Sequence, residues 1–468
     1  MFEISFNRTL HFYFSTFFSF LQEIFVKIFR SYFVTLFVRI NKKGVLTIRI
    51  LHFITDTNIG GAGRLLCNQI KNINTDEFEI FVALPQNSSL MGELALLPCE
   101  TVPLSGSADR SFNLSDVGEC LGVIKKVKPD IVHSHSSLSS RISASLLSMP
   151  CRVFTRHCTF PLSPIMTSPI SKLVIGGVNS LLSTSIIAVA EAAKNDLIAT
   201  GCNERSIHTV INGVEPIEVI SEDEKEFVRS RYGIRGGDFV IGIFARLESY
   251  KGHSDLLRAA RICKRYYSNF RFLIVGDGTL MGELKELAVK LGVDEMCLFV
   301  GFCRDVTPLF NIIDVNANCS FGTETSSLSL SEGMSLGIPA VASDFGGNTY
   351  MVKNAENGLI YPKQNAEALA MALIRLYRDK ELYKKCSAGA YRRFREELNA
   401  RAMTEKMMDF YRQEYTRSKS KGTGKRAKSS EIERKQAKSS EIERNRAKTS
   451  ENERNRAKNE QKQSKIKY

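Results

Sequence analysis

Two glutamates, Glu324 and Glu332, stand with seven residues between them in GTETSSLSLSEG (322–333), where most other side chains are small or hydroxylic. Carboxylates accept hydrogen bonds from hydroxyl groups, which sugars carry in number. If a helix begins near Ser327, Glu324 lies in the loop before it and Glu332 in its second turn, and free backbone N–H groups at 327–329 point toward a phosphate. The spacing fits this sugar-phosphate site and an ordinary helix start with a surface glutamate equally well.

Two further loops carry groups suited to a diphosphate. Arg246 and Lys251 are five positions apart and follow the apolar run FVIGIF (239–244). A guanidinium fork and an ammonium can clamp a diphosphate together, although two cations in a loop are more often simply solvated. Near the other end, GGAG (60–63) precedes a helix, and its glycines allow the backbone to approach an anion. A glycine-rich loop alone is weak evidence for such a site.

Short apolar runs alternate with helical patterns through the middle of the chain. This alternation indicates parallel β-α-β units, and a second series begins after the acidic stretch near 221–226. We therefore predict an α/β fold of two doubly wound parallel-sheet domains facing a cleft, with ligands at the carboxyl ends of the strands. The expected strands are TIRILHFI (47–54), FEIFVAL (78–84), DIVHSH (130–135), RVFTRH (152–157), SIIAVA (185–190), FVIGIFARL (239–247), RFLIVGDG (271–278), MCLFVGF (296–302), DVNANCS (314–320) and PAVASD (339–344).

The net charge of +14 comes from the two ends of the chain. Residues 417–468 hold 18 Lys and Arg against 7 acids, and residues 1–45 hold 6 against 2, so the body between them is close to neutral. The basic composition therefore does not indicate that the body binds nucleic acid. Eleven cysteines without CxxC pairs favour buried thiols in a reducing cytoplasm, and the nearest cluster, Cys151, His157 and Cys158, has no common zinc spacing.

Both ends differ from the body in composition. Residues 1–43 hold 11 of the 29 phenylalanines, but the longest uncharged run, 9–22, is shorter than the roughly 20 residues of a membrane-spanning helix. This segment is either an interfacial amphipathic helix or an upstream extension that precedes a start near Val45. The other end repeats a ten-residue unit that begins with KRAKSSEIER (425–434) and is almost without apolar side chains. We expect a disordered, solvated tail there, and the alternative is a tail that contacts anionic lipid or RNA.

The order and spacing of motifs over about residues 46–416 resemble those of a retaining family 4 glycosyltransferase, whose architecture is the two-domain GT-B fold. The matching pieces are NIGGAGRLL (58–66), DIVHSH (130–135), VAEAAKNDLIATG (189–201), VINGV (210–214), ARLESYKG (245–252), VGDG (275–278), ETSSLSLSE (324–332) and GIPAVASDFGG (337–347). The domains implied are an aromatic-rich extension at 1–45, a Rossmann-like acceptor domain at 46–220, a Rossmann-like donor domain at 221–395, a crossover helix at 396–416 and a basic repeat tail at 417–468.

The resemblance also implies roles for single residues. Glu324 would bind the hydroxyls of the donor sugar, Glu332 would bond the ribose of the nucleotide, and Arg246 and Lys251 would neutralise the diphosphate leaving group. His157 would face the sugar, while the role of a satisfied loop histidine competes with this one. The other residues implied on the donor side are Ser327, Leu328, Ser329, Gly276 and Gly61, with His135 on the acceptor side and His133 in a structural role.

The activity implied is that of a hexosyltransferase that moves a sugar, with retention, from a nucleotide sugar to a glycan or lipid-linked acceptor of a bacterial-type surface polysaccharide. No metal, other cofactor or specific nucleic acid is expected. The expected location is cytoplasmic and peripheral to the inner face of the plasma membrane, where the basic termini would meet anionic lipid. A GT-B sugar-nucleotide epimerase, recognisable by donor turnover without an acceptor, and a non-catalytic glycan-binding or scaffold protein stay open as alternatives.

Some positions depart from the usual pattern of the family, which leaves the sugar preference open. Gly63 stands where many relatives carry Glu, Thr325-Ser326-Ser327 replaces Gly-Phe-Gly, and Thr349-Tyr350 replaces Pro-Glu in GGNTY (346–350).

Overall fold

The structure is a computed structural model that describes residues 47–422 apart from residues 58, 107–110 and 160–161. The extension expected at 1–45 lies outside the described residues, as does the expected tail from residue 423 onward.

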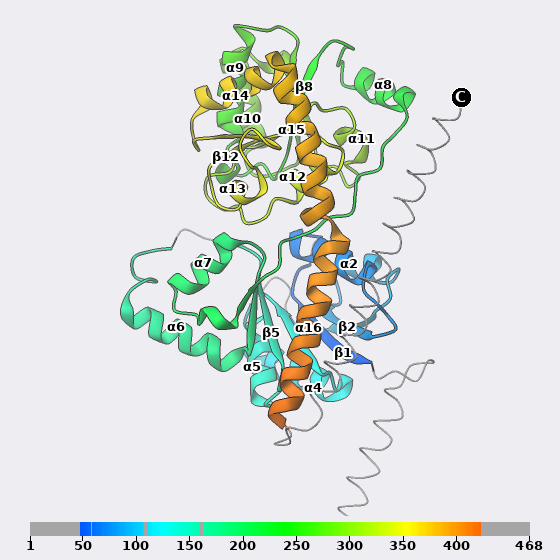
Figure 1. Ribbon diagram of the computed structural model, residues 1–468, viewed down its shortest axis with the longest axis vertical. Helices are drawn as coiled ribbons and strands as arrows, with labels where there is room; N and C mark the ends of the chain where they lie inside the picture. The colour runs from blue at the N-terminus through cyan, green and yellow to red at the C-terminus, as the bar shows by residue number, and fades with distance from the viewer. Residues whose placement is uncertain (1–46, 58, 107–110, 160–161, 423–468) are drawn as a thin grey trace, which may run out of the picture. The chain divides into compact units, whose positions relative to one another are not determined.

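Two all-parallel sheets organise the described chain (Figure 1). The first sheet has the order β3-β2-β1-β4-β5-β6-β7 and the second has the order β10-β9-β8-β11-β12-β13. The first comprises β1 (Ile48–Ile54), β2 (Phe78–Pro85), β3 (Glu100–Leu104), β4 (Ile131–His135), β5 (Arg152–Arg156), β6 (Ser185–Ala188) and β7 (Ile207–Thr209). The second comprises β8 (Phe239–Phe244), β9 (Phe270–Val275), β10 (Cys297–Gly301), β11 (Val315–Asn318), β12 (Ala340–Ser343) and β13 (Gly358–Tyr361).

The two sheets confirm the predicted α/β fold with two doubly wound domains. In each sheet the winding direction reverses once, between β1 and β4 in the first and between β8 and β11 in the second. Ligands of such sheets bind beyond the carboxyl ends of the strands at this switch point, because the loops diverge there. The loops after these four strands therefore position the candidate site.

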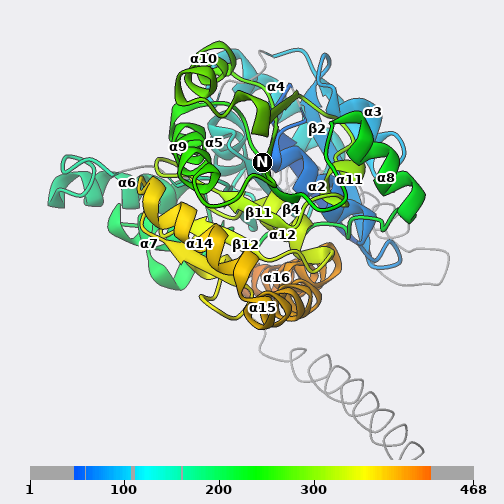
Figure 2. The same cartoon turned by 90° about the horizontal axis from the view of Figure 1, so that it is seen from above.

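Helices pack along both sheets, and in the second sheet α9 contacts both α10 and α14 (Figure 2). The helices of the first half are α2 (Gly61–Lys71), α3 (Leu90–Leu94), α4 (Leu114–Val127), α5 (Leu138–Leu146), α6 (Pro169–Leu182) and α7 (Glu191–Ala199). Those of the second half are α8 (Glu222–Arg231), α9 (His253–Lys264), α10 (Met281–Leu291), α11 (Thr307–Phe310), α12 (Leu328–Ser335), α13 (Asn348–Met351), α14 (Ala366–Arg378) and α15 (Lys380–Arg393).

The apolar runs of the second sheet are buried on both faces. In β8, Ile241 and Ile243 join one core cluster while Val240 joins the other. Burial on both faces explains why the strands appear in the sequence as continuous apolar runs rather than as an alternating pattern.

Three strands, β3, β7 and β13, were missing from the sequence prediction, and all three lie at sheet edges. An edge strand needs less burial than a central one, and β3 is half-exposed along its length and contains Pro103. Short strands without a strong apolar run carry too little sequence signal for recognition.

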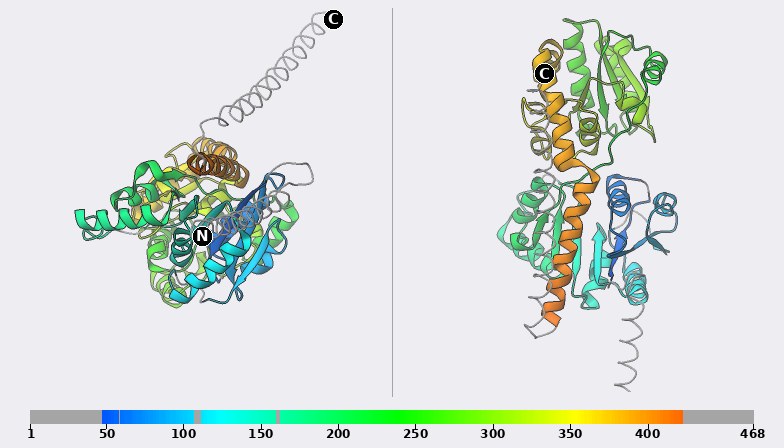
Figure 3. Two further views of the ribbon diagram at one scale, coloured as in Figure 1. Left: turned by 90° about the horizontal axis from the view of Figure 1, so that it is seen from below. Right: turned by 45° about the vertical axis from the view of Figure 1, so that its right-hand side comes forward.

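A long carboxyl-terminal helix, α16 (Ala400–Gly422), follows a π-helical turn at Phe394–Leu398 that continues from α15 (Figure 3). Tyr411 of α16 bonds to the first half of the chain, with its hydroxyl 3.1 Å from Nε2 of Gln69 and 2.7 Å from Nδ1 of His133. A crossover helix was expected at 396–416. Within the described residues, every helix is too short or too polar to cross a bilayer.

Candidate active site

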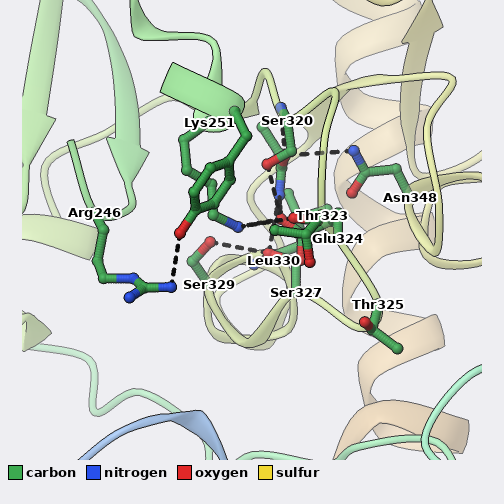
Figure 4. Close-up of polar contacts among 12 residues, drawn as sticks. Arg246, Lys251, Ser320, Thr323, Glu324, Thr325, Ser327, Ser329, Leu330 and Asn348 are labelled. Atoms are coloured by element: carbon green, nitrogen blue, oxygen red, sulfur yellow. Dashed lines mark hydrogen bonds and ion pairs between the residues drawn. The ribbon is translucent and has the colours of Figure 1, made fainter. Parts of the chain in front are cut away.

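Glu324 is a buried carboxylate in the loop between β11 and α12 (Figure 4). One of its oxygens accepts hydrogen bonds from Lys251 Nζ at 2.9 Å, Asn318 Nδ2 at 3.1 Å and Ser320 Oγ at 2.9 Å. Burial alone would raise the pKa of Glu324, but the Lys251 ammonium and these hydrogen bonds outweigh it and hold the pKa below its usual value. Glu324 is therefore an ionised acid at neutral pH.

Lys251 reaches Glu324 because the loop after β8 packs against the end of β11. Gly252, next in sequence, has a left-handed backbone (φ 72°), and a Cβ at this position would collide with the carbonyl oxygen of Cys319. A side chain at residue 252 would push the loop outward, so this glycine is what permits the ion pair.

A glycine pair, Gly346 and Gly347, fixes the Glu324 loop from the other side. The N–H of Gly347 donates to the carbonyl oxygen of Glu324 at 3.0 Å. A Cβ on Gly346 would collide with that same carbonyl, and one on Gly347 would collide with the carbonyl of Thr325. The GG of GGNTY thus positions the candidate sugar-binding acid, while Tyr350, in the place of the family's Glu, donates its hydroxyl to Glu397 at 2.7 Å.

Helix α12 starts where the sequence predicted a helix. Ser327 is its N-cap, and the Ser327 Oγ accepts the backbone N–H of Leu330 at 3.3 Å. The Oγ of Ser329 lies 3.1 Å from that of Ser327. The first turn of α12 carries no acid, so the positive end of the helix dipole is not offset by a side chain there.

A second helix start lies beside the first. Helix α2 begins at Gly61 with neither a side-chain cap nor an acid in its first turn. A Cβ placed on Gly61 would lie 4.0 Å from Cδ1 of Leu328, so the first residues of α2 and α12 are neighbours. In the same α2 turn, at Gly63, where many family members carry Glu, a Cβ would lie 2.8 Å from Cδ1 of Leu90, so the Leu90 side chain would have to shift to admit a larger residue.

Glu332 pairs with a residue that the sequence analysis did not consider. Arg64 Nη2 donates to Glu332 Oε1 at 2.8 Å. Burial raises the pKa of Glu332, and Arg64 offsets this only in part. The Arg64 side chain is 47% exposed, so water screens its charge, whereas the Glu332 side chain is 6% exposed. The bond from Glu332 to a ribose remains a prediction. In this structure the partner of the Glu332 carboxylate is Arg64.

Arg246 and Gly276 are placed differently from Lys251. The guanidinium of Arg246 donates to the Tyr250 hydroxyl at 2.8 Å rather than to Glu324 (Figure 4). Gly276 has a positive φ of 137°, and a Cβ on it would collide with the carbonyl oxygen of Ala245. The structure therefore gives Gly276 a packing role, and it brings Lys251, but not Arg246, into contact with Glu324.

The predicted histidines lie at the carboxyl ends of β4 and β5. His135 Nδ1 is 2.9 Å from His157 Nε2, and burial lowers the pKa of His157 to about 4. His133 is satisfied on both ring nitrogens, by Tyr411 and, at 2.6 Å, by Thr155 Oγ1, which accords with a structural role. The sequence analysis missed His52, whose Nδ1 lies 2.9 Å from His135 Nε2.

Threonines link the His157 loop to the Glu324 loop. The backbone N–H of Thr159 donates to Thr325 Oγ1 at 3.0 Å, and Thr323 Oγ1 donates to the Thr159 carbonyl at 3.0 Å. Thr325 occupies the first position of the family's Gly-Phe-Gly, so this departure supplies a contact that a glycine could not. Asn318 and Ser320 lay inside the predicted strand at 314–320, and Thr159 followed the predicted strand at 152–157, so the sequence did not mark any of the three as a site residue.

Comparison with known proteins decides the family. The protein-family model described as Glycosyltransferase Family 4 matches residues 59–218 of this sequence. The family model described as Glycosyl transferases group 1 matches residues 224–393. The chain belongs to this glycosyltransferase family.

Individual relatives agree with that membership. This glycosyltransferase is 26% identical over 326 residues to the putative glycosyltransferase EpsD of Bacillus subtilis, covering 66% of this chain and 84% of EpsD. It is 27% identical over 344 residues to UDP-Gal:alpha-D-GlcNAc-diphosphoundecaprenol alpha-1,3-galactosyltransferase of Escherichia coli, covering 68% of this chain and 87% of the relative. Anabaena Alr3699/HepE, solved with UDP, has the same fold, with a TM-score of 0.65, 20% identity and coverage of 78% of this chain and 99% of HepE. The protein is thus a GT-B glycosyltransferase of glycan biosynthesis.

Proposed function

We propose that this glycosyltransferase moves a hexose, with retention of anomeric configuration, from a nucleotide sugar to a glycan or lipid-linked acceptor in surface polysaccharide biosynthesis. The observation that carries the proposal is the buried, ionised Glu324, held by Lys251 directly before the start of α12. A fixed carboxylate can orient sugar hydroxyls, and a helix start beside it can hold the phosphate of the same donor.

The diphosphate would lie where the starts of α2 and α12 meet. Two adjacent helix starts without acids, and Lys251 nearby, favour negative charge at one place. Charge develops on this diphosphate as the glycosidic bond breaks, so groups fixed in advance lower the barrier. Arg246 would join them by leaving its Tyr250 partner.

The acids of the site also support independence from a metal. Glu324 is engaged by Lys251, and Glu332 by Arg64, so neither offers a free pair of oxygens. Three histidines, His52, His133 and His135, bring ring nitrogens within 4.8 Å of one another. Their nitrogens already have partners within the protein, since His52 Nδ1 pairs with His135 Nε2 and both nitrogens of His133 pair with Tyr411 and Thr155, which disfavours chelation.

A donor screen tests the function. At about one hundred times its Kd, the correct nucleotide sugar should stabilise the full chain by about 2.7 kcal/mol and raise Tm by several degrees. UDP-glucose and UDP-galactose are the first probes, because HepE was solved with UDP-glucose and the Escherichia coli relative is named for UDP-Gal. The bound donor should then support transfer to an acceptor, with unchanged rate in excess EDTA and an α-linked product from an α-linked donor.

Three outcomes would contradict the proposal. If no nucleotide sugar stabilises the protein, the proposed donor site is wrong. If activity is lost in excess EDTA, the enzyme depends on a metal. Donor turnover without any acceptor product would favour an epimerase.

The membrane-peripheral location gains support from an exposed apolar face on α6. Ile170 and Leu173 are each 78% exposed, and Val174 and Leu181 are exposed on the same side of the helix. Lys172 is the single charged side chain from 162 to 190, so the segment contains no acid that anionic lipid would repel.

Vesicle co-sedimentation tests this lipid contact. Wild-type protein should bind anionic vesicles, and Ile170→Ser with Leu173→Ser should weaken binding at least tenfold, since each buried aliphatic side chain contributes about 1.5–3 kcal/mol. Leu96→Ser is the matched control, because Leu96 is also highly exposed but lies outside α6. Unchanged binding by the α6 variant, or a change of oligomeric state instead, would contradict a lipid-facing role.

A further inference from the structure

A row of three imidazoles, those of His52, His135 and His157, lies at the switch point of the first sheet. His52 of β1 stands in register with His133 of β4, and His135 lies two residues further along β4 on the same face. The Nδ1 of His52 is 2.9 Å from Nε2 of His135, and the Nδ1 of His135 is 2.9 Å from Nε2 of His157. Consecutive rings stack with centroids 5.2 Å apart in both pairs.

The three rings are neutral at physiological pH. Burial lowers the pKa of His52 to about 3 and that of His157 to about 4, and it lowers that of His135 well below its usual value, with its histidine neighbours adding to the effect. A neutral imidazole has one N–H donor and one acceptor nitrogen. The row therefore has only two proton arrangements, in which all three rings donate in the same direction.

The two ends of the row decide between these arrangements. Among the described residues, neither Nε2 of His52 nor Nδ1 of His157 has a hydrogen-bond partner, and His52 is fully enclosed. One end must carry a bare acceptor and the other an N–H. An unsatisfied buried N–H is rarer in proteins than an unsatisfied acceptor, so the bare nitrogen belongs at the enclosed His52. The Nδ1 of His157 is also buried in this structure, but His157 as a residue is partly exposed, so His157 is the end of the row at which an entering substrate can supply a partner, and the N–H belongs there.

We infer that His52 and His135 are positioning residues that hold His157 as a neutral hydrogen-bond donor, with its Nδ1–H directed at a substrate hydroxyl oxygen. The substrate hydroxyl in this assignment rests on the proposed function, whereas the position of the proton on His157 rests only on the hydrogen bonds of the row. His52 Nδ1–H donates to His135 Nε2, and His135 Nδ1–H donates to His157 Nε2, which leaves His157 its proton on Nδ1. His133 takes no part, because Tyr411 and Thr155 occupy both its nitrogens.

The tautomer can be read directly by ¹⁵N NMR of the full chain labelled in its seven histidines. His157, assigned through loss of its signals in His157→Gln, should carry its proton on Nδ1 at neutral pH without any substrate. A proton on Nε2 of His157 would overturn the inference. Since this readout needs no turnover, an inactive protein with the Nδ1–H tautomer would refute the proposed function and leave the positioning role intact.

Two substitutions at His135 make a matched pair. His135→Asn places an amide N–H near the position of Nδ1–H and should keep the His157 tautomer and a higher transfer activity than His135→Phe. His135→Phe removes the donor, so His157 should show mixed tautomers and transfer should fall about tenfold, the value of one neutral hydrogen bond. Equal activities and equal spectra in the two variants would overturn the inference. If His135→Phe fails to fold, His52→Asn and His52→Leu provide the same comparison from the far end of the row.

Discussion

Glu324→Gln is expected to lower kcat/KM for sugar transfer by about 10²–10³-fold or more, while the protein remains folded. Glutamine preserves the size of the side chain and removes the charge that Lys251, Asn318 and Ser320 surround. The Lys251 ammonium then stays buried without a counter-charge, which costs about 3–5 kcal/mol of stability. Steady-state transfer and thermal unfolding measure the two effects, and Glu283→Gln, at an exposed site on α10, is the matched control.

The same variant has a pH signature. Because the folded pKa of Glu324 is lowered, its ionised form stabilises the protein above the ordinary pKa near 4.5, and this contribution is lost as the pH falls through the folded pKa. The difference in unfolding free energy between wild type and Glu324→Gln should therefore shrink below about pH 4.5. Full transfer activity in Glu324→Gln would contradict the assigned role.

Lys251→Met is expected to impair transfer about as strongly, by 10²–10³-fold, since it removes the cation nearest to the candidate diphosphate position. It also deprives Glu324 of the interaction that most lowers its pKa. The pKa of Glu324 should therefore rise, and the variant should be more destabilised at pH 7 than at pH 4, where a protonated carboxyl no longer needs the ammonium. Unfolding at the two pH values measures this difference.

A double variant separates stability from catalysis. Lys251→Met with Glu324→Gln replaces both charges, so its unfolding free energy should exceed the value expected from adding the two single losses. Its transfer activity should stay as low as that of either single variant. Additive stability losses would show that the ion pair is not the coupling between these residues, and recovered transfer would contradict the roles of both.

The sequence predicted the features of the site that depend on local chain geometry. The helix start at Ser327, with Glu324 before it and Glu332 in its second turn, follows from small hydroxylic residues that cap helices. The repeated strand–helix alternation predicted two parallel sheets, and the carboxyl ends of their strands correctly brought together the loops of Glu324 and Lys251.

Partners that are distant in sequence could not be predicted. Arg64 meets Glu332 across 268 positions, and Thr159 meets Thr325 across 166, because the two halves of the chain place α2 beside α12. His52 was missed because a histidine inside an apolar strand carries no signal until the register sets it opposite His133. Arg246 and Lys251 could not be told apart in sequence, because both are cations in the loop after β8. In the structure Arg246 bonds to Tyr250, whereas Lys251 bonds to Glu324.

The most direct measurement is a structure of the full chain with a bound UDP-sugar, or with whichever donor the screen selects. We expect the diphosphate to contact backbone N–H groups at the starts of α2 and α12 and to lie near Lys251, with a sugar hydroxyl on the Glu324 carboxylate. A donor bound with its diphosphate elsewhere, or with its sugar away from Glu324, would contradict the account.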